Sequence, residues 1–525
     1  MKIPMKTRFA AALLLACGCS DSDSSAGSES ESEAEPESLA FPEGFLFGTS
    51  VAGFQVDMGC PTLAASVCED PNSDWYAFAT AKETVGSANA HLSGQHPSVG
   101  PGHWELYEQD LDRAAGELSG NSFRTSIEWS RVFPTATDDL DGYDALSEAA
   151  DDDAIAHYHA LFQAALDRGL TLLVTLNHYS LPLWIHDGVS CHVDLDTCSP
   201  RGWLDRERTV REIAKYAGFA AREFAAEVDL WATLNEPFAV MLPGYLMPSA
   251  ERTNPPAVSL RIDEAKEVTL ALIEAHARMY DAVKEADVED ADGDGDDARV
   301  GVVYPMVPVR PLDPDDPLDV QAAENVFYLY NMVYLNAVAK GELDDDFDGV
   351  AEHRDDLAGR MDYMGINYYT RITVEGTSAS ILPDFSPLLT FNPTTLQLWE
   401  DYPRGVYEMA MLVKDAFSLP SIVTENGAAD PDDDGTAPSY LARHLTWIAR
   451  AIRDGADMRG YFYWTLMDNY EWNHGMNIRM GLYAVDKDDP TKMRIARQAV
   501  DVYARIARAG AIPPEIAATY PAPEE

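Results

Sequence analysis

The fold of this chain is indicated most clearly by the stretch Ser421-Ile422-Val423-Thr424-Glu425-Asn426-Gly427, an apolar run that ends on a glutamate. The run has the length of a buried strand, and the Asn-Gly pair that closes it marks a turn. A second stretch, Thr233-Leu234-Asn235-Glu236-Pro237, continues the apolar run from Leu230 and is closed by proline. Burial of an isolated carboxylate is costly, so a glutamate that ends a hydrophobic strand usually has a partner or a task.

Apolar runs of this kind alternate along the chain with helix-like segments such as Ala156–Arg168 and Arg208–Ala226. The eight runs are Phe45–Val51, Phe123–Trp129, Leu170–Leu176, Leu230–Leu234, Val300–Val303, Tyr363–Ile366, Ser421–Thr424 and Tyr461–Thr465. Periodicity alone gives the class α/β, and eight strand–helix units suggest a single (β/α)8 barrel, the TIM barrel, with long loops at the C-terminal face of the strands. We expect this domain to occupy residues 41–510, followed by a tail over residues 511–525, with neither an internal repeat nor an interdomain linker.

Polar residues follow the runs, at the strand ends where such barrels carry their chemistry. Two glutamates that converge across the barrel mouth push their pKa values apart, so that one stays ionised and the other holds a proton. This is the equipment for glycoside hydrolysis with retention, provided that the carboxyls lie roughly 5 to 5.5 Å apart. The alternative is that Glu236 and Glu425 merely cap the helices that follow them.

The motifs, taken in order, resemble glycoside hydrolase family 1, the β-glucosidase family, from about Phe41 to Val502. The two glutamate stretches resemble the family's T-x-N-E-P and I-T-E-N-G motifs. The other segments that resemble it are Phe45–Thr49 with Ala52–Gln55, Arg124–Arg131, Asn177–Pro182, Gly365–Tyr369, Trp464–Trp472, Arg479–Leu482 and Val485–Asp486. Segments Gly53–Gly59 and Glu69–Trp75 resemble the archaeal-type branch most closely.

The resemblance implies a role for each polar residue of the site. Glu425 would attack the anomeric carbon, and Glu236 would protonate the leaving oxygen and later deprotonate water. Arg124 and Tyr369 would lie against Glu425, where a cation keeps a carboxyl ionised, and Asn367 would join the same network. The implied sugar-binding residues are Asn235 at the 2-hydroxyl, Gln55, His178, Glu471 and Trp472 at other hydroxyls, Tyr369, and Trp464 as a stacking platform.

Several residues of the implied site bear on the substrate. Family members that act on phosphorylated sugars have small or basic residues where Glu471 stands, and a carboxylate there would repel a phosphate, so we expect a non-phosphorylated substrate. The intact Glu236 argues against the plant thioglucosidase branch, where glutamine replaces it. Tyr179 stands where the family commonly has tryptophan, Met480 where an aromatic residue is usual, and Asp57 in place of glutamate.

The composition excludes several functions. The chain has 525 residues, with 46% hydrophobic residues, enough for a sizeable core, and a formal net charge of -50. That charge argues against a nucleic-acid binder and against docking on an anionic membrane through basic residues. The excess of acidic residues fits a salty environment, or simply an acidic secreted protein.

The first forty residues predict export. Lys2, Lys6 and Arg8 precede a short apolar stretch, Phe9–Ala16, which is too short to span a bilayer. We expect residues 1–16 to be a lipoprotein-type signal peptide, because Leu14-Leu15-Ala16-Cys17 resembles a lipobox and implies lipidation of Cys17; an ordinary signal peptide is the alternative. Residues 17–40 are rich in Ser and Glu and indicate a disordered tether.

The other four cysteines agree with export. Cys60 and Cys68, and likewise Cys191 and Cys198, stand close enough for local disulfides, and both segments are expected near the barrel mouth. Four cysteines allow three connectivities, of which we prefer the two local pairs. A zinc site is disfavoured, because no close C-x-x-C pair occurs.

Two acidic stretches approach calcium-loop spacing. Asp344, Asp346 and Asp348 precede Gly349, and Asp355 falls at the closing position. The stretch Asp290–Gly295 begins the same way, with acids at positions 290, 292 and 294, but lacks the closing acid. Such runs also arise by chance in an acidic protein, and any calcium would be structural, since sugar hydrolysis requires no cofactor.

The sequence therefore predicts a retaining, exo-acting β-glycosidase, exported and anchored by a lipid or else secreted or periplasmic. Its substrates would be small β-glycosides or oligosaccharides with terminal β-D-glucosyl residues, with β-D-galactosyl and β-D-fucosyl residues as further candidates. The alternatives are a transglycosylase that uses the same site, and a non-catalytic surface protein that binds sugar or calcium. The sequence does not fix the oligomeric state.

Overall fold

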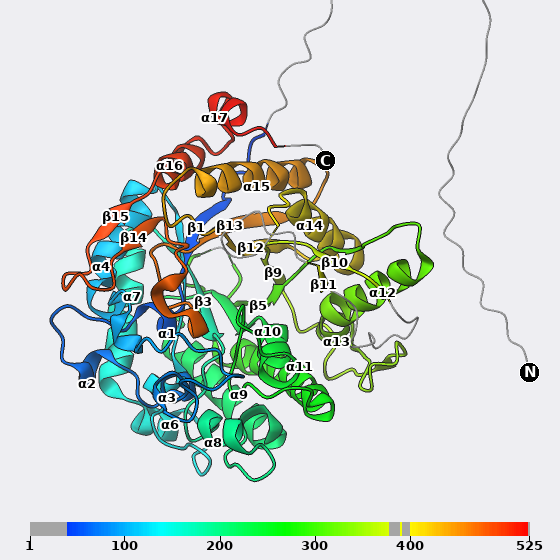
Figure 1. Ribbon diagram of the computed structural model, residues 1–525. Coiled ribbons are helices and arrows are strands. Elements are labelled where there is room, and N and C mark those ends of the chain that lie inside the picture. Colours follow the sequence, from blue (N-terminus) through cyan, green and yellow to red (C-terminus); the bar gives the residue numbers. More distant parts are fainter. Residues whose placement is uncertain (1–38, 294, 377–388, 391–399, 523–525) are drawn as a thin grey trace, which may run out of the picture. The chain divides into compact units, whose positions relative to one another are not determined.

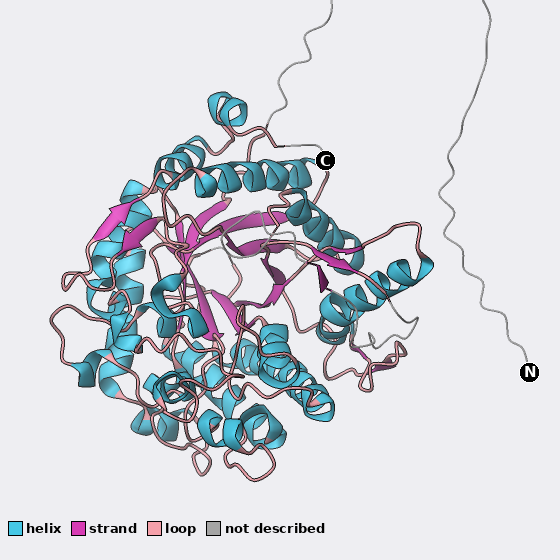
Figure 2. Ribbon diagram, viewed as in Figure 1, coloured by secondary structure: helices cyan, strands magenta, loops and turns pink. Residues whose placement is uncertain are grey.

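The centre of the molecule is a closed barrel of eight strands, in the order β1-β13-β12-β9-β5-β4-β3-β2 (Figures 1 and 2). The structure, a computed structural model, describes residues 39–293, 295–376, 389–390 and 400–522. Every neighbouring pair of barrel strands is parallel. The barrel strands are β1 (Leu46–Ser50), β2 (Ser122–Ser126), β3 (Thr171–Asn177), β4 (Leu230–Asn235), β5 (Arg299–Pro305), β9 (Tyr363–Asn367), β12 (Ser421–Asn426) and β13 (Met458–Trp464).

All eight predicted runs lie on barrel strands, and the (β/α)8 architecture is confirmed. The second run extends beyond its strand, and its last residue, Trp129, begins the short helix α5 (Trp129–Val132). The run is buried throughout, Trp129 as fully as Phe123, and burial alone does not separate a strand from the helix after it.

The N-terminal end of the barrel is filled by side chains. One buried cluster comprises Leu173, Leu230, Ala232, Val303, Tyr363, Ile422 and Phe462, with Leu46 packed against it. Most of these residues come from the first half of their strands, so they close the barrel at its N-terminal end. Polar chemistry is therefore confined to the opposite, C-terminal end.

Helices surround the barrel (Figure 2). The helices are α1 (Gly53–Val56), α2 (Ala65–Cys68), α3 (Asp74–Thr80), α4 (His103–Asp112), α5, α6 (Tyr143–Ala149), α7 (Asp152–Leu166), α8 (Gly188–Val193), α9 (Arg206–Glu223), α10 (Pro237–Met241), α11 (Ile262–Ala286), α12 (Pro317–Phe327), α13 (Val333–Lys340), α14 (Arg404–Phe417), α15 (Thr436–Arg453), α16 (Ala499–Ala509) and α17 (Pro514–Thr519). The sequence sets their ends locally: Asp151 caps α7 by accepting a hydrogen bond from the Ala154 amide at 2.9 Å. The predicted segments 156–168 and 208–226 correspond to α7 and α9.

Smaller elements decorate the loops. Three short strands, β6 (Val309–Pro311), β10 (Ile372–Val374) and β11 (Leu389–Thr390), form one sheet, and two pairs, β7 (Glu342–Leu343) with β8 (Glu352–His353) and β14 (Tyr483–Val485) with β15 (Arg494–Ala496), form two more. Wider, π-type helical turns cover Arg113–Glu117, Leu242–Leu246 and Tyr328–Met332, and 3-10 turns cover Pro97–Val99, Gly202–Leu204 and Trp472–Asn477. None of the helices in the described ranges is both long and apolar enough to cross a membrane.

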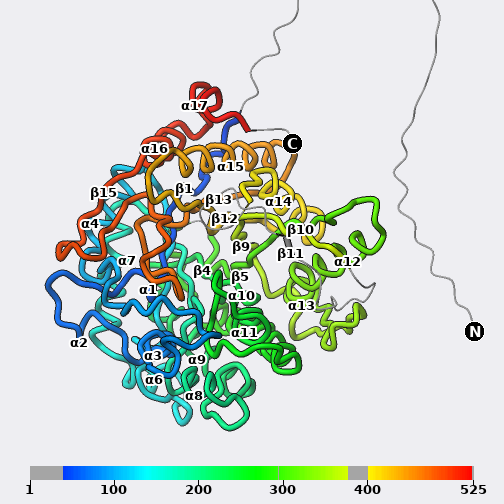
Figure 3. Tube along the Cα trace, viewed as in Figure 1, coloured from blue at the N-terminus to red at the C-terminus, as the bar shows by residue number. Residues whose placement is uncertain are grey.

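The two ends of the described chain meet (Figure 3). Ala40 bridges Ala511, and the Phe41 amide donates to the Gly510 carbonyl at 2.9 Å, just before β1 begins. The compact unit thus begins at Leu39, two residues before the predicted boundary. The predicted signal peptide, Cys17 and the tether as far as residue 38 lie outside the described residues.

The predicted tail, residues 511–525, is part of the fold in its first half. Residues 514–519 form α17, and Ile512 and Ile516 are buried against the main core. Ile512 precedes the helix and Ile516 is the one buried residue within it, so the helix has too few apolar positions to stand out in the sequence.

Candidate active site

Glu236 and Glu425 lie at the C-terminal ends of two barrel strands. Glu236 directly follows Asn235, the last residue of β4, and its amide donates to the Val303 carbonyl at 2.8 Å. Glu425 belongs to β12 and lies opposite Asn367 of β9, past a register shift after Val423. The shift matters because it breaks the regular alternation of β12 where the carboxylate turns toward the mouth.

Both oxygens of Glu425 accept a hydrogen bond. Arg124, fully buried on β2, donates from Nη1 to Oε1 at 2.7 Å, and the Tyr369 hydroxyl donates to Oε2 at 2.8 Å. Thr175 of β3 holds the other side of Arg124, accepting from Nε at 3.1 Å. The carboxylate is therefore fixed in place by groups that both favour its charged form.

Both oxygens of Glu236 are bonded as well. Asn367 donates from Nδ2 to Oε1 at 2.8 Å, and the Tyr179 hydroxyl donates to Oε2 at 2.5 Å. Glu236 has a left-handed backbone, with φ of 45°, as do Tyr179 at 71° and Trp472 at 49°. Such conformations are strained for residues other than glycine and cluster at functional sites.

The two carboxyls are linked through Asn235. Its Oδ1 accepts from Arg124 Nη2 at 2.7 Å and from Asn367 Nδ2 at 3.3 Å. Thr424 completes the link by donating from Oγ1 to Asn367 Oδ1 at 2.8 Å. One buried network thus joins β2, β4, β9 and β12, and it fixes the orientation of every amide in it.

The charge state of Glu425 reflects opposing influences. Burial raises its pKa to about 7, Arg124 lowers it, and the nearby charge of Glu236 raises it again. The sequence predicts a Glu425 kept ionised by a cation, and the cation is present. The effect of the cation is smaller than expected because Glu425 is buried and lies near a second carboxyl, Glu236.

Gln55, on α1, and Glu471, after β13, lie together. Gln55 Nε2 donates to Glu471 Oε2 at 3.0 Å, and Asn469 Nδ2 donates to the same oxygen at 3.1 Å. Gln55 is 1% exposed, yet its Oε1 has no hydrogen-bond partner among the described residues. A buried acceptor without a partner is costly, so this atom is suited to receive a ligand hydroxyl.

His178 presents a second such atom. Asn235 Nδ2 lies 3.2 Å from His178 Nε2, and burial together with Arg124 and Arg252 holds the pKa of the imidazole well below its usual range. The neutral ring therefore accepts at Nε2 and carries its hydrogen on Nδ1. That buried Nδ1 has no hydrogen-bond partner within the described part of the chain.

Trp464 and Trp472 flank His178. Both indoles lie nearly parallel to its ring, at an interplanar angle of 11°, with centroids 5.8 Å and 6.0 Å away. Met480, which stands where an aromatic residue is usual, packs beside Trp464 in a small buried cluster. These rings supply flat apolar faces of the kind on which sugars stack.

Gly427 shows why the Asn-Gly pair ends β12. A Cβ added to Gly427 would lie 2.0 Å from the Trp464 carbonyl oxygen, an impossible contact. The glycine lets the chain after Glu425 pass directly against the end of β13, which brings Glu425 and Trp464 into one mouth.

Asp57 does not take part in the network around Gln55. Its carboxyl is buried 3.6 Å from Arg131 Nε, and burial raises its pKa to about 8 despite that cation.

The two predicted disulfides, Cys60–Cys68 and Cys191–Cys198, are both present. They lie in the loops that follow β1 and β3, which is the mouth side of the barrel.

The sequence predicts neither the position of Arg252 nor the hydrogen bond from Tyr179 to Glu236. The Arg252 guanidinium lies 5.0 Å from the Tyr179 ring centre and 3.5 Å from Glu471 Oε1. Arg252 follows no apolar run and matches no quoted motif, so the sequence offers no signal for it. Tyr179 was visible only as a departure from a family pattern.

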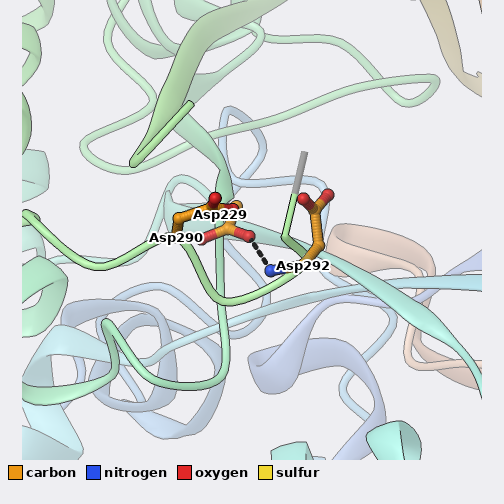
Figure 4. A group of neighbouring side chains, drawn as sticks. All are labelled: Asp229, Asp290 and Asp292. Carbon is orange, nitrogen blue, oxygen red and sulfur yellow. Dashed lines mark hydrogen bonds between the residues drawn. The ribbon is translucent and has the colours of Figure 1, made fainter. Parts of the chain in front are cut away.

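The acidic stretches form two groups of neighbouring carboxylates. Asp344, Asp346 and Asp348 come together, whereas Asp355 lies outside this group, bonded to His353 at 3.0 Å with its side chain 99% exposed. Asp290 and Asp292 join Asp229 instead (Figure 4), and the Asp292 amide donates to Asp229 at 2.5 Å. Asp294 lies outside the described residues. Oxygen-only groups of this kind suit calcium, and neither touches the barrel mouth.

Known proteins share this fold and length. The sequence profile of glycosyl hydrolase family 1 matches residues 37–511. A β-galactosidase of Pyrococcus woesei is 36% identical over 499 residues, which is 87% of this chain and 95% of that protein.

Two solved structures superimpose closely. The β-glycosidase of the hyperthermophile Thermosphaera aggregans gives a TM-score of 0.80 at 30% identity, covering 92% of this chain and 100% of that one. The hyperthermophilic β-glucosidase of Pyrococcus furiosus gives 0.78 at 32% identity, covering 92% and 98%.

Proposed function

This chain belongs to glycosyl hydrolase family 1, as its motifs predict, and we propose that it is a retaining, exo-acting β-glycosidase that works through a covalent glycosyl-enzyme. The observation that carries the proposal is the pair of glutamates at the ends of β4 and β12, joined by the Arg124, Asn235 and Asn367 network. Capping of helices does not account for Glu236, whose side chain forms no cap bond to α10, or for Glu425, which lies within β12.

In the first step, ionised Glu425 attacks the anomeric carbon while Glu236 gives a proton to the leaving oxygen. The bond from carbon to the leaving oxygen breaks as the bond to the Glu425 oxygen forms. Arg124 and Tyr369 hold the attacking carboxylate in one orientation, so little reorganisation is needed as charge leaves it.

In the second step, Glu236 takes a proton from water, and that water attacks the glycosyl-enzyme. Glu236 must therefore be ionised once the leaving group has gone. Esterification of Glu425 removes its charge, and this favours the ionised form of Glu236 that accepts the proton.

We propose a terminal, non-phosphorylated β-D-glucosyl residue as the preferred glycone, with β-D-galactosyl and β-D-fucosyl residues also accepted. The unpaired Gln55 Oε1 and His178 Nδ1 offer one acceptor and one donor to sugar hydroxyls, and Trp464 offers a platform. The Glu471 carboxylate disfavours a sugar phosphate by repulsion. The names of the relatives, a β-galactosidase and a β-glucosidase, support both glycones.

We further propose that the protein is exported and held at a membrane by a lipid on Cys17, or released if that cysteine is not lipidated. The charged start and the short apolar stretch before Cys17 support this placement. Calcium at Asp344, Asp346 and Asp348 would serve the structure alone, because the proposed reaction uses no metal.

The test uses the mature protein and p-nitrophenyl β-D-glucoside. Wild type is expected to release nitrophenol, and Glu425→Ala is expected to lose at least 1,000-fold in kcat. Azide should partly restore Glu425→Ala and give the α-glucosyl azide, because it attacks from the face that the nucleophile occupied.

Glu236→Ala is the matched control for that experiment. It keeps the nucleophile, so azide attacks the glycosyl-enzyme and the product is the β-glucosyl azide. Opposite azide anomers from the two variants would establish both roles, and identical anomers would contradict them. Turnover that yields longer saccharides in excess acceptor would favour the transglycosylase, and absence of any turnover despite sugar binding would favour the binding protein.

A further inference from the structure

Tyr179 contacts Glu236 more closely than any other side chain described. It follows β3, is 3% exposed, and donates from its hydroxyl to Glu236 Oε2 at 2.5 Å. Its ring is held edge-on by Trp472 and by His178, each with centroids 5.0 Å away. The phenol therefore has a fixed position over one oxygen of the acid/base.

Arg252 covers the ring of Tyr179. Its guanidinium lies 5.0 Å from the Tyr179 centroid and 5.6 Å from that of Trp472. The loop that carries Arg252 is pinned on both sides: Asn473 Nδ2 donates to the Ala250 carbonyl at 3.0 Å, and the Thr253 amide donates to Asn473 Oδ1 at 3.3 Å. The cation is thus part of the rigid wall of the mouth.

A phenol can follow both states that Glu236 must adopt. It donates to the carboxylate, and after rotation of its hydroxyl it accepts from the carboxylic acid. The indole N–H of a tryptophan, the residue common at this position in the family, can only donate. A cation over the ring withdraws electron density from the phenol and strengthens it as a donor.

We propose that Tyr179, oriented and polarised by Arg252, is a positioning residue for the acid/base, and that it sets the pH at which Glu236 gives up its proton. In the first step, the Tyr179 hydroxyl accepts a hydrogen bond from protonated Glu236. In the second step, it donates a hydrogen bond to Glu236 and stabilises the ionised form that acts as the base. This inference rests on the proposed function, since it concerns the same reaction.

Four other groups face Glu236 across the mouth. Tyr330 and Tyr369 come from the turn after α12 and the segment after β9, Glu425 from β12, and Arg252 from its loop. Tyr369 is hydrogen-bonded to Glu425, and no hydrogen bond joins Tyr330 to Glu236 in the described part of the chain. Of the three tyrosines near Glu236, Tyr179 is therefore the one whose hydroxyl is hydrogen-bonded to Glu236 within the described residues.

The experiment is the pH profile of kcat/KM for aryl β-glucosides, whose basic limb reports loss of the Glu236 proton. Tyr179→Phe removes a bond that is stronger with the ionised than with the protonated form of Glu236, so the basic limb should move to higher pH by about one to two units. Tyr330→Phe removes a neighbouring phenol that makes no such bond, and its limb should stay in place. A basic limb that is unmoved in Tyr179→Phe would overturn the proposal.

Arg252 gives a second, independent arm. Arg252→Met should move the same limb upward by a smaller amount, and Arg252→Lys should restore it, since the charge returns. A downward shift, or equal shifts in Met and Lys variants, would contradict the role given to the cation. Wild-type turnover and the azide products are recorded first, so failure of the hydrolase proposal is recognised separately.

Discussion

At the scale of single residues, the charge on Glu425 is the most sensitive quantity in the site. Its pKa is raised to about 7, and attack requires the ionised form. We therefore expect kcat/KM to fall as the pH drops through about 7, with the acidic limb belonging to the coupled pair. Glu236→Gln removes the charge that raises this pKa, so the acidic limb should move to lower pH.

The measurement uses 2,4-dinitrophenyl β-D-glucoside, whose good leaving group needs no acid in the first step. Wild type and Glu236→Gln are compared over pH 4 to 9. An acidic limb that stays in place or rises in the variant would show that Glu236 does not act on Glu425.

Arg124 carries the second prediction at this scale. Arg124→Met leaves Glu425 buried without its cation and frees Asn235, so kcat/KM should fall by at least 100-fold and the acidic limb should rise. The free energy of unfolding in urea should drop by about 3–5 kcal/mol, the usual result of breaking a buried ion pair.

Arg124→Lys is the matched variant. It keeps the positive charge but cannot reach Glu425 and Asn235 together, because it lacks the forked guanidinium. The acidic limb should return toward its wild-type position while kcat/KM stays low. Full recovery of kcat/KM would show that Asn235 needs no support from Arg124.

The resemblance to the family predicts both hydrogen-bond partners of Glu425, Arg124 and Tyr369, and it also predicts Asn367, which donates to Glu236. It does not predict Arg252, which enters the site through bonds of its loop to Asn473. It also says nothing about whether Asp57 turns to Gln55 or to Arg131. Contacts of this sort depend on how distant loops pack, which no local pattern records.

At the scale of elements, the loop between β1 and β2 is stapled by the Cys60–Cys68 disulfide, across a separation of eight residues. A disulfide that closes a loop of this size stabilises the fold by about 2–3 kcal/mol, because it lowers the conformational entropy of the unfolded chain. We expect Cys60→Ser/Cys68→Ser to lose that amount in chemical unfolding.

The matched control is Cys191→Ser/Cys198→Ser, whose separation of seven residues predicts nearly the same loss. Equal losses fit an effect on the unfolded chain alone. A loss in one double variant several times that in the other would contradict this account and indicate an effect on the native loop.

Gly427 offers a test at the junction of β12 and β13. Gly427→Ala forces apart the Trp464 carbonyl and the chain after Glu425, so we expect a loss of about 1–3 kcal/mol in stability and at least a tenfold loss in kcat. Gly116→Ala is the control, because an added Cβ there meets nothing within 4 Å. A fully active Gly427→Ala would show that the mouth tolerates a wider gap.

Most of the eight strands are readable in the sequence because each contains a short apolar run closed by a turn or a polar residue, whereas β2 contains a single apolar residue. The small strands and α17 are not readable, since those whose burial is described carry at most two buried residues each. The π-type turn at Tyr328–Met332 differs from an α-helix only in its hydrogen bonding, which side-chain periodicity does not report.

At the scale of the whole molecule, the net charge of -50 dominates. Mutual repulsion of exposed carboxylates opposes the compact state and is screened by salt, with a Debye length of about 10 Å at 0.1 M and 3 Å at 1 M. We expect Tm to rise by several degrees between low salt and 1 M NaCl, measured by calorimetry at pH 7.

Choline chloride at equal ionic strength is the control, because screening depends on ionic strength and not on the identity of the cation. Equal rises in both salts would support repulsion. A rise in NaCl alone would contradict screening as the cause and point to specific binding of sodium.

The pairing of Ala40 with Ala511 has a mechanical consequence. The chain enters the barrel at the N-terminal end of β1, and Glu236 and Glu425 lie at the opposite, C-terminal end of the strands. A pull or solid support attached at Leu39 therefore acts on the N-terminal end of the barrel, opposite the end that carries Glu236 and Glu425. Attachment at that residue leaves the entrance of the site uncovered, so that the end of a bulky polymer still reaches it.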